Sequence, residues 1–473
     1  MGTISSAFSL ISGALDADQS ALSIVANNVA NANTTGYTQE VPNWQQNTPV
    51  EINGVSYGTG VTETGPTSVR DRVLEERLTQ QQQLASASGA RLTSLDTLQA
   101  LFTPDSGSSS STAGDIGSDI TSFFDSFSSL EANPTNNALR QQVLSTGSTL
   151  AGDVSNAAAS LDSQKSALDQ DASGVTSQVN ALTGAIAQLN QQIQSTSPSG
   201  DAGTLEDQRQ QDLGQLSQLI GINQISTENN GLSITTTSGQ LLVSEGSSTP
   251  LTTGTVDGVT HFFVGTTDVT SQLASGGGQL GGYLTARDQD IPNVMSSLDQ
   301  LAYSVSTQVN ALNNAGTDLD GVSGTAANPL NIFSQPTAVA GSAASMSVVM
   351  TDPNQVAAAG SGQGTGANSN ATAMASLSKQ SIVSGETPSN YYSNFVTTLG
   401  STVSQVQTEN TAQNASVTQL QTQRDTLSSV NLNDEASAMQ TLERSYQAAS
   451  QVFTMLNTII GSALNLGVET AVS

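Results

Sequence analysis

An apolar stripe that repeats every seven residues runs along each end of the chain. The N-terminal stripe consists of Ile4, Phe8, Ile11, Leu15, Leu22, Val25 and Val29, and the C-terminal stripe of Met439, Leu442, Tyr446, Phe453, Leu456 and Ile460. This spacing places a narrow apolar face on one side of a long helix, as in a coiled coil. No matching stripe follows the first one closely in sequence. We therefore expect the two terminal helices to pair with each other and to enclose the rest of the chain between them.

The interior alternates between two periodicities. Residues 38–72 read as loops and short strands. Apolar residues recur with a helical period from residue 73 to residue 220 and after residue 277, and with a period of two between them. In the middle stretch, Ser238-Gly239 and Asp257-Gly258 each separate two alternating runs, which is the pattern of a β-hairpin. Residues 315–370 are rich in Gly, Ser and Ala and read as irregular.

The predicted fold class is therefore mainly α with a β insert. It combines a discontinuous terminal coiled coil, a long-helix bundle domain and a small antiparallel β domain. The predicted boundaries are 1–32 and 434–473 for the coiled coil, 33–221 and 277–433 for the bundle, and 222–276 for the β domain. Asn31 to Tyr37 reads as a loop that ends the first helix, and Asn433 or Asp434 as the N-cap of the last.

Charge excludes several classes of partner. The chain carries 11 basic and 39 acidic residues, for a formal charge of −28. Nucleic-acid binding requires a basic stripe to neutralise phosphates, and an anionic membrane surface attracts basic clusters. The basic residues are scattered, and no apolar run approaches the ~20 residues of a membrane span. We expect no nucleic-acid partner, no membrane partner and no cleaved signal peptide, since a positive segment before a continuous apolar core is lacking.

The residues for most catalytic and metal chemistry are also scarce. The chain has no cysteine and one histidine, which excludes disulfides, thiol catalysis and multi-histidine zinc sites. His261 lies in a strand-like run and is interpreted as a structural residue. Asp318 to Gly321 resembles only a fragment of a calcium loop and is interpreted as a turn. We expect no catalytic residue, no metal and no cofactor.

Both ends of the chain resemble one protein family. Residues 26–37, Ala-Asn-Asn-Val-Ala-Asn-Ala-Asn-Thr-Thr-Gly-Tyr, resemble the N-terminal signature of flagellar rod, hook and hook-associated proteins. Residues 430–435 and 442–449 resemble the C-terminal signature of the same family. The interior helices at 73–102 and 135–195 are most similar to those of hook-associated members at the hook–filament junction. Gln39-Glu40 departs from the Arg-Gln common after Gly-Tyr-Thr, and the short 315–370 region implies a reduced outer region.

The resemblance implies a non-enzymatic structural component of the bacterial flagellum that joins hook to filament and is needed for filament assembly. The implied partners are copies of itself in a ring of the axial tube, the hook protein, a second hook–filament junction protein and a flagellar export chaperone. The implied location is extracellular, at the hook–filament junction, after export by the flagellar type III pathway. We expect assembly to depend on the two stripes and on Asn31, Asn33, Gly36, Tyr37, Asn431 and Leu432.

Two alternatives stay open. The chain could be another axial protein, such as a hook or distal-rod component. A less favoured alternative is a secreted enzyme or effector on an axial scaffold. Glu228, Glu245 and Asp257 are the carboxylates that such an enzyme would offer, but they lie near predicted turns and are interpreted as solvated side chains.

Overall fold

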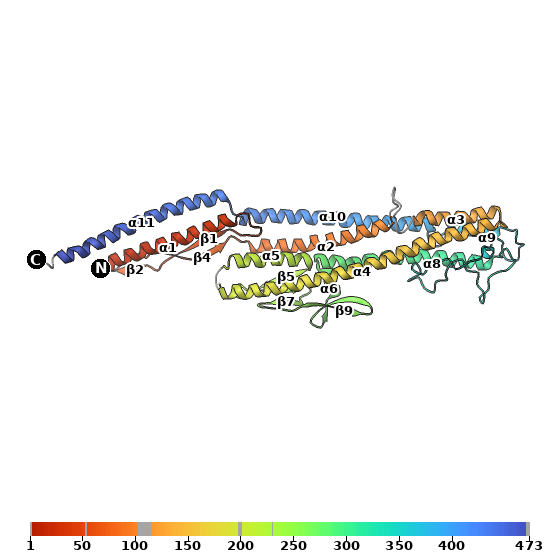
Figure 1. Cartoon of the computed structure of the whole chain (residues 1–473), viewed down its shortest axis with the longest axis horizontal. Helices are drawn as coiled ribbons and strands as arrows, with labels where there is room; N and C mark the ends of the chain where they lie inside the picture. Colours follow the sequence, from red (N-terminus) through yellow and green to blue (C-terminus); the bar gives the residue numbers. More distant parts are fainter. Residues whose placement is uncertain (1, 53, 103–114, 197–200, 229, 470–473) are drawn as a thin grey trace.

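The molecule is elongated, and both termini lie at the same end of it (Figure 1). The computed structural model describes residues 2–52, 54–102, 115–196, 201–228 and 230–469. Residues 103–117 are rich in Ser and Gly, which predicts a linker, and they lie mostly outside the described residues. Two parts follow each other along the long axis. We call them the arm, which contains both ends of the chain, and the body.

The arm is built from the two terminal helices and a β-ribbon. Helix α1 (Gly2–Asn31) lies beside α11 (Leu432–Glu469), as the paired stripes predict. The antiparallel ribbon β1 (Glu40–Gln46) and β4 (Val61–Ser68) runs along α1, and the hairpin β2 (Val50–Ile52) and β3 (Val55–Tyr57) extends it.

The predicted domain boundary at residue 33 assigns these strands to the bundle, and it stays a prediction. In the structure, β1 and β4 lie against α1. The side chains of β1 and β4 are mostly exposed, so their sequence lacks the alternation that would have marked a half-buried sheet. The other domain boundaries stay a prediction.

The body is a bundle of long helices. Helix α10 (Pro388–Ser428) packs along α2 (Arg72–Phe102), and α4 (Asn137–Thr196) packs with α3 (Ile116–Ala132) at one end and α5 (Thr204–Leu219) at the other. The other bundle elements are α6 (Thr270–Gly276), α7 (Gly278–Thr285), a π-helical turn (Ala286–Asp290), α8 (Ile291–Ala315) and α9 (Ser369–Ser376).

The β insert forms two small antiparallel sheets. One has the order β5-β6-β7-β8 and the other β11-β10-β9. The Asp257-Gly258 turn joins β9 to β10 with φ angles of 50° and 80°, a left-handed backbone that favours Asp and Gly. The hairpin prediction is confirmed. The strands are β5 (Ile222–Ser226), β6 (Leu232–Thr236), β7 (Leu241–Ser244), β8 (Ser247–Ser248), β9 (Leu251–Val256), β10 (Val259–Val264) and β11 (Thr267–Asp268).

Two apolar cores follow each other along α4. The first contains the phenylalanines of α3 and the inner faces of α2, α8 and α10, with Phe123, Phe124 and Phe127 fully buried. The second joins the C-terminal half of α4 to α5, α7 and the β sheets around Phe262. The fold class is confirmed: long helices with a small antiparallel insert.

The irregular segment after α8 is ordered by side chains of that helix. Asn310 and Asn313 are buried and hydrogen-bond to backbone groups of the loop, which replaces the missing secondary structure. Asn313 Nδ2 donates to the carbonyls of Leu330 (2.6 Å) and Gln355 (3.1 Å), and its Oδ1 accepts from the Ala357 N–H at 2.8 Å. The segment contains isolated bridges and one short 3-10 turn (Pro353–Gln355).

A carboxylate pair between α3 and α4 makes a pH-dependent contribution to stability. Burial, followed by the hydrogen bond and charge of Asp153 and the charge of Asp115, raises the pKa of Asp119 to about 7. The folded state therefore binds this proton more tightly than the unfolded chain, and its contribution to the unfolding free energy falls as pH rises from about 4 to about 7.

Asp119→Asn can keep the contact with Asp153 without a titrating proton. We expect the variant to come closest to the wild type at about pH 4 and to be more stable than it at about pH 8. Urea unfolding at both pH values measures this. An identical pH dependence in the two proteins would show that the pair does not share a proton.

Candidate functional site

The two terminal helices meet along a thin apolar seam. Its buried centre is formed by Ala21, Val25 and Leu442. Toward the chain ends, the rings of Phe8 and Phe453 lie with centroids 4.6 Å apart. The seam thus joins residues more than four hundred positions apart, as the two stripes predict. Its small buried centre indicates that this pairing alone gives modest stability.

The structure brings most of the predicted seam residues to this interface, but not all of them. Val29, Leu432 and Tyr446 are exposed, with 40%, 51% and 38% of their surface accessible. The side chain of Ile4 lies outside the described residues. The remaining predicted positions are half-buried: Phe8, Ile11, Leu15, Leu22, Met439, Phe453, Leu456 and Ile460. Whether these residues carry assembly stays a prediction.

A second face of α1 contacts the ribbon, and sequence reasoning missed it. Ile24 is 7% exposed although it lies outside the predicted stripe. Ser20 Oγ donates to the Glu63 carboxylate at 3.0 Å, and Gly60 lies against Leu10. Helix α1 is therefore held on two sides, by α11 and by the ribbon.

The arm meets the body at a joint that we call the elbow, residues 28–40 and 428–435. Asn28, 1% exposed, is its central side chain. Its Nδ2 donates to the Glu40 carbonyl (2.7 Å) and to the Glu435 carboxylate (3.0 Å). Its Oδ1 accepts from the Tyr37 hydroxyl (2.9 Å) and the Glu40 N–H (3.0 Å). One amide thus uses its full hydrogen-bonding capacity to join α1, the loop, β1 and α11.

The loop that follows α1 has the geometry its residues predict. Gly36 has φ = 83°, a left-handed conformation that glycine adopts without strain. Asn31 donates to the side-chain oxygen of Asn27 at 2.8 Å, and Thr34 N donates to the Asn31 carbonyl at 2.8 Å. Asn33 is exposed. Asn31, Gly36 and Tyr37 therefore shape the loop, and Tyr37 also reaches Asn28.

Helix α11 begins earlier than expected. Its first residue is Leu432, and the side chain of Asn431 accepts from the Asn433 N–H at 3.1 Å. Asn431 is thus the N-cap, rather than Asn433 or Asp434. The earlier start places Glu435, 3% exposed, within the first turns, where it accepts from both Asn28 and Gln39.

The elbow is bound to α5 of the body by charged side chains. Thr38 N donates to Asp207 at 2.9 Å, and Arg70 forms ion pairs with Glu206 and Asp207. Burial, and then the nearby charges of Asp201 and Asp207, raise the pKa of Glu40. Burial likewise raises the pKa of Tyr37, so its hydroxyl stays a donor to Asn28.

Gln39 offers a substitution that should strengthen the elbow. Its Nε2 donates to Glu435 at 2.7 Å, and its backbone bonds to Ser428 and Val69. Gln39→Arg would place a guanidinium beside Glu435 in a strongly acidic surrounding. We expect the unfolding free energy to rise by about 1 kcal/mol, because a hydrogen bond from a charged guanidinium stabilises more than one from a neutral amide. Gln39→Glu should lower it. Chemical denaturation of both variants checks the signs, and a stabilising Gln39→Glu would contradict the contact.

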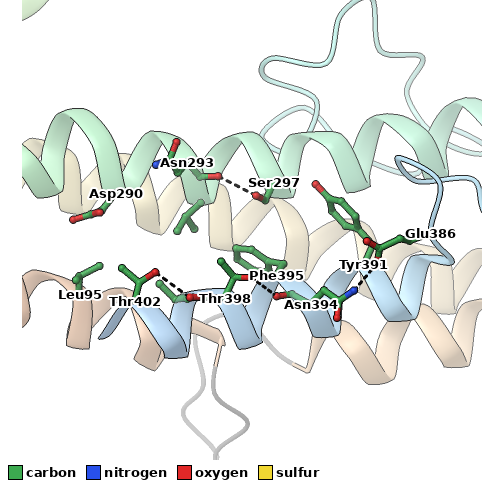
Figure 2. A pocket seen from close by; sticks show the side chains of 12 residues that line it. Leu95, Asp290, Asn293, Ser297, Glu386, Tyr391, Asn394, Phe395, Thr398 and Thr402 are labelled. Atoms are coloured by element: carbon green, nitrogen blue, oxygen red, sulfur yellow. Dashed lines mark hydrogen bonds between the residues drawn. The ribbon is translucent and has the colours of Figure 1, made fainter. Parts of the chain in front are cut away.

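The body has a groove between α8 and α10 with a cavity volume of about 330 Å³. Figure 2 shows Tyr391 and Phe395 of α10 between the two helices. Both carboxylates that line the groove are paired. Asp290 binds Arg91 through two contacts of 2.8 Å, and Glu386 accepts a hydrogen bond from Asn394 at 2.6 Å. None of the predicted site residues lines this groove.

The carboxylates named for the enzyme alternative do not converge. Glu245 and Asp257 are exposed turn residues with positive φ, and Glu228 is also exposed. His261 of β10 bonds to Asp268 at 2.6 Å. Within the described residues, no three acid or histidine side chains gather as metal ligands would, and none of the helices has the length and hydropathy to cross a membrane.

Two family models match the chain over most of its N-terminal two thirds. Residues 106–327 match the helical domain of the flagellar hook-associated protein FlgK, and residues 11–38 match the flagella basal body rod protein. The chain is thus similar to the FlgK family of flagellar hook-associated proteins. The rod-type match covers most of α1 and the elbow loop as far as Tyr37, so it contains Asn28.

Curated members of the FlgK family support this placement. Flagellar hook-associated protein 1 of Salmonella typhimurium is 27% identical over 322 residues, which are 66% of this chain and 57% of that protein. The Bacillus subtilis protein of the same name is 27% identical over 351 residues, covering 66% and 67%. The match thus spans just over half the length of the Salmonella protein.

The fold is also that of a solved FlgK. The flagellar hook junction protein FlgK from Burkholderia pseudomallei superposes with a TM-score of 0.65 at 17% sequence identity. The superposition covers 75% of this chain and all of that one. The resemblance of the N-terminal end to axial proteins agrees with the rod-protein match over residues 11–38.

Proposed function

We propose that this chain is a structural component of the bacterial flagellum that joins the hook to the filament and is needed for filament assembly. One observation supports this most strongly. The helical domain of the hook-associated family lies between the two halves of an arm, and the first half matches rod proteins. The arm is then the part common to axial proteins, and the body the part specific to the junction.

The arm has features that suit packing between copies. Its internal seam covers only one side of α11, and Val452, Met455 and Ile459 remain exposed on that helix, at 44%, 60% and 53%. We propose that copies of the chain form a ring in the axial tube through these helices. The hook protein and the second junction protein are its neighbours along the axis, and an export chaperone binds it before assembly.

We further propose that the protein acts outside the cell after export by the flagellar type III pathway. An arm with a thin seam suits this route, since little free energy opposes its unfolding before export. The family resemblance supports the chaperone and the pathway.

Deletion of the gene distinguishes this proposal from its alternative. We expect cells with complete hooks, no filaments and flagellin released into the medium, as seen by electron microscopy and immunoblotting. Complementation with the full chain should restore filaments. Loss of the hook itself would indicate a hook or distal-rod component instead, and normal filaments would contradict both assignments.

A further inference from the structure

A polar pocket of about 290 Å³ lies where the start of α2, helix α5 and the β5–β6 turn meet. It is lined by three of the chain's eleven basic residues, Arg70, Arg72 and Arg209. These arginines are dispersed in sequence, and only the fold brings Arg209 to the other two. In a chain with a formal charge of −28, this is a local concentration of cationic donors.

Three buried donor-bearing atoms on the pocket's lining residues have no partner among the described residues. They are Arg70 Nε, Gln224 Nε2 and Thr227 Oγ1, from three different segments. The side chain of Arg70 is only 7% exposed, and its two terminal nitrogens are taken by Glu206 and Asp207. Buried donors normally have acceptors, so three unpartnered ones at one pocket indicate an acceptor that binds there.

The arginines are held in place before any ligand binds. Arg209 donates to Asn190 Oδ1 at 2.9 Å and to the Asn230 carbonyl at 2.7 Å. Burial lowers the pKa of Arg209 to about 10; the charge of Glu206 opposes this shift, and the smaller repulsions from Arg70 and Arg72 add to it. The three cations therefore repel one another, and an added negative charge would relieve that repulsion.

The acidic residues of the pocket limit how much charge it accepts. Glu206 is shared between Arg70 and Arg72, and Glu75 and Glu76 also line the pocket. Burial raises the pKa of Glu75. A dianion would meet strong repulsion here, whereas a single carboxylate offers the acceptor oxygens that the donors require.

We propose that this pocket binds one carboxylate group, supplied either by a small molecule or by an acidic side chain of a second copy of the chain. Arg72, whose side chain is 61% exposed, is the guanidinium at the entrance, and Gln224 and Thr227 complete the donor set inside.

Sodium acetate tests the site directly on the full-length protein. Saturation-transfer NMR on the acetate methyl group should give a saturable signal at constant ionic strength. Arg72→Gln should weaken acetate binding about tenfold, because one charge-assisted hydrogen bond is lost. Gln224→Met should also weaken binding while raising the melting temperature of the free protein, because it removes a buried unpartnered donor.

Arg77→Gln is the matched control, since Arg77 is an exposed arginine of the same helix outside this pocket. It should leave acetate affinity unchanged. A signal that does not saturate, or equal affinities in all three variants, would overturn the proposal.

Self-association separates the two sources. If a second copy supplies the carboxylate, acetate and Arg72→Gln will both weaken self-association in sedimentation experiments. If a small molecule supplies it, acetate will bind without changing self-association. Either result, together with saturable binding to the wild type, supports the carboxylate site.

Discussion

Replacing Asn28 with alanine should loosen the arm from the body and abolish filament assembly. The substitution removes four hydrogen bonds and leaves the Glu40 backbone, the Tyr37 hydroxyl and the Glu435 carboxylate without that partner. Because these groups are largely buried, we expect a loss of about 2–4 kcal/mol in the stability of the elbow. Hydrogen exchange of residues 26–40 and 432–440 should accelerate, and a complemented deletion strain should lose motility.

Asn33→Ala is the matched control. It removes the same type of side chain from the loop that follows α1, at an exposed position. Its hydrogen-exchange rates should stay close to those of the wild type. Equal effects of the two substitutions would mean that the Asn28 network does not determine the geometry of the elbow.

Leu442→Ala should separate the two terminal helices. Leu442 is one of three buried residues in the centre of the seam, with Ala21 and Val25. Removing it should cost the arm about 2 kcal/mol, near the lower end for a large-to-small change because the surrounding cluster is small and partly open. We expect limited proteolysis to cut residues 1–31 and 432–469 faster in the purified monomer, while the body stays intact.

Met455→Ala separates pairing within the chain from packing between chains. Met455 lies on the same helix but is 60% exposed. Its replacement by alanine should therefore leave the monomer's proteolysis pattern unchanged. If the exposed side of α11 packs against a neighbouring copy, Met455→Ala should still reduce filament assembly. If the arm of the Leu442→Ala variant resists proteolysis as well as the wild-type arm does, the seam contributes little to the stability of the arm.

The pairing of the chain ends was predictable because a seven-residue period is visible without knowing the partner. Val25 and Leu442 lie on the predicted stripes and are buried, and Phe8 meets Phe453 as the register requires. The Asp257-Gly258 hairpin was predictable for a similar reason. Its turn needs a left-handed backbone, and few residues supply one.

The elbow was only partly predictable. Its loop was visible in the Asn-rich sequence, but Asn28 and Glu435 are polar, lie 407 positions apart and belong to helices that would normally expose them. The contacts of Arg70 with α5, and the meeting of Arg70, Arg72 and Arg209, likewise depend on how α2 and α5 pack. The packing of the ribbon against α1 was not predictable, because its exposed strands carry no alternating pattern.

Localising the protein on intact flagella tests the central claim most directly. The chain has no cysteine, so Thr266→Cys in the exposed β10–β11 turn would give one site for a fluorescent maleimide. With filaments stained in a second colour, we expect one spot at the proximal end of each filament, where it meets the hook. Label along the whole hook or the whole filament, or none on the flagellum, would contradict a role in joining the two.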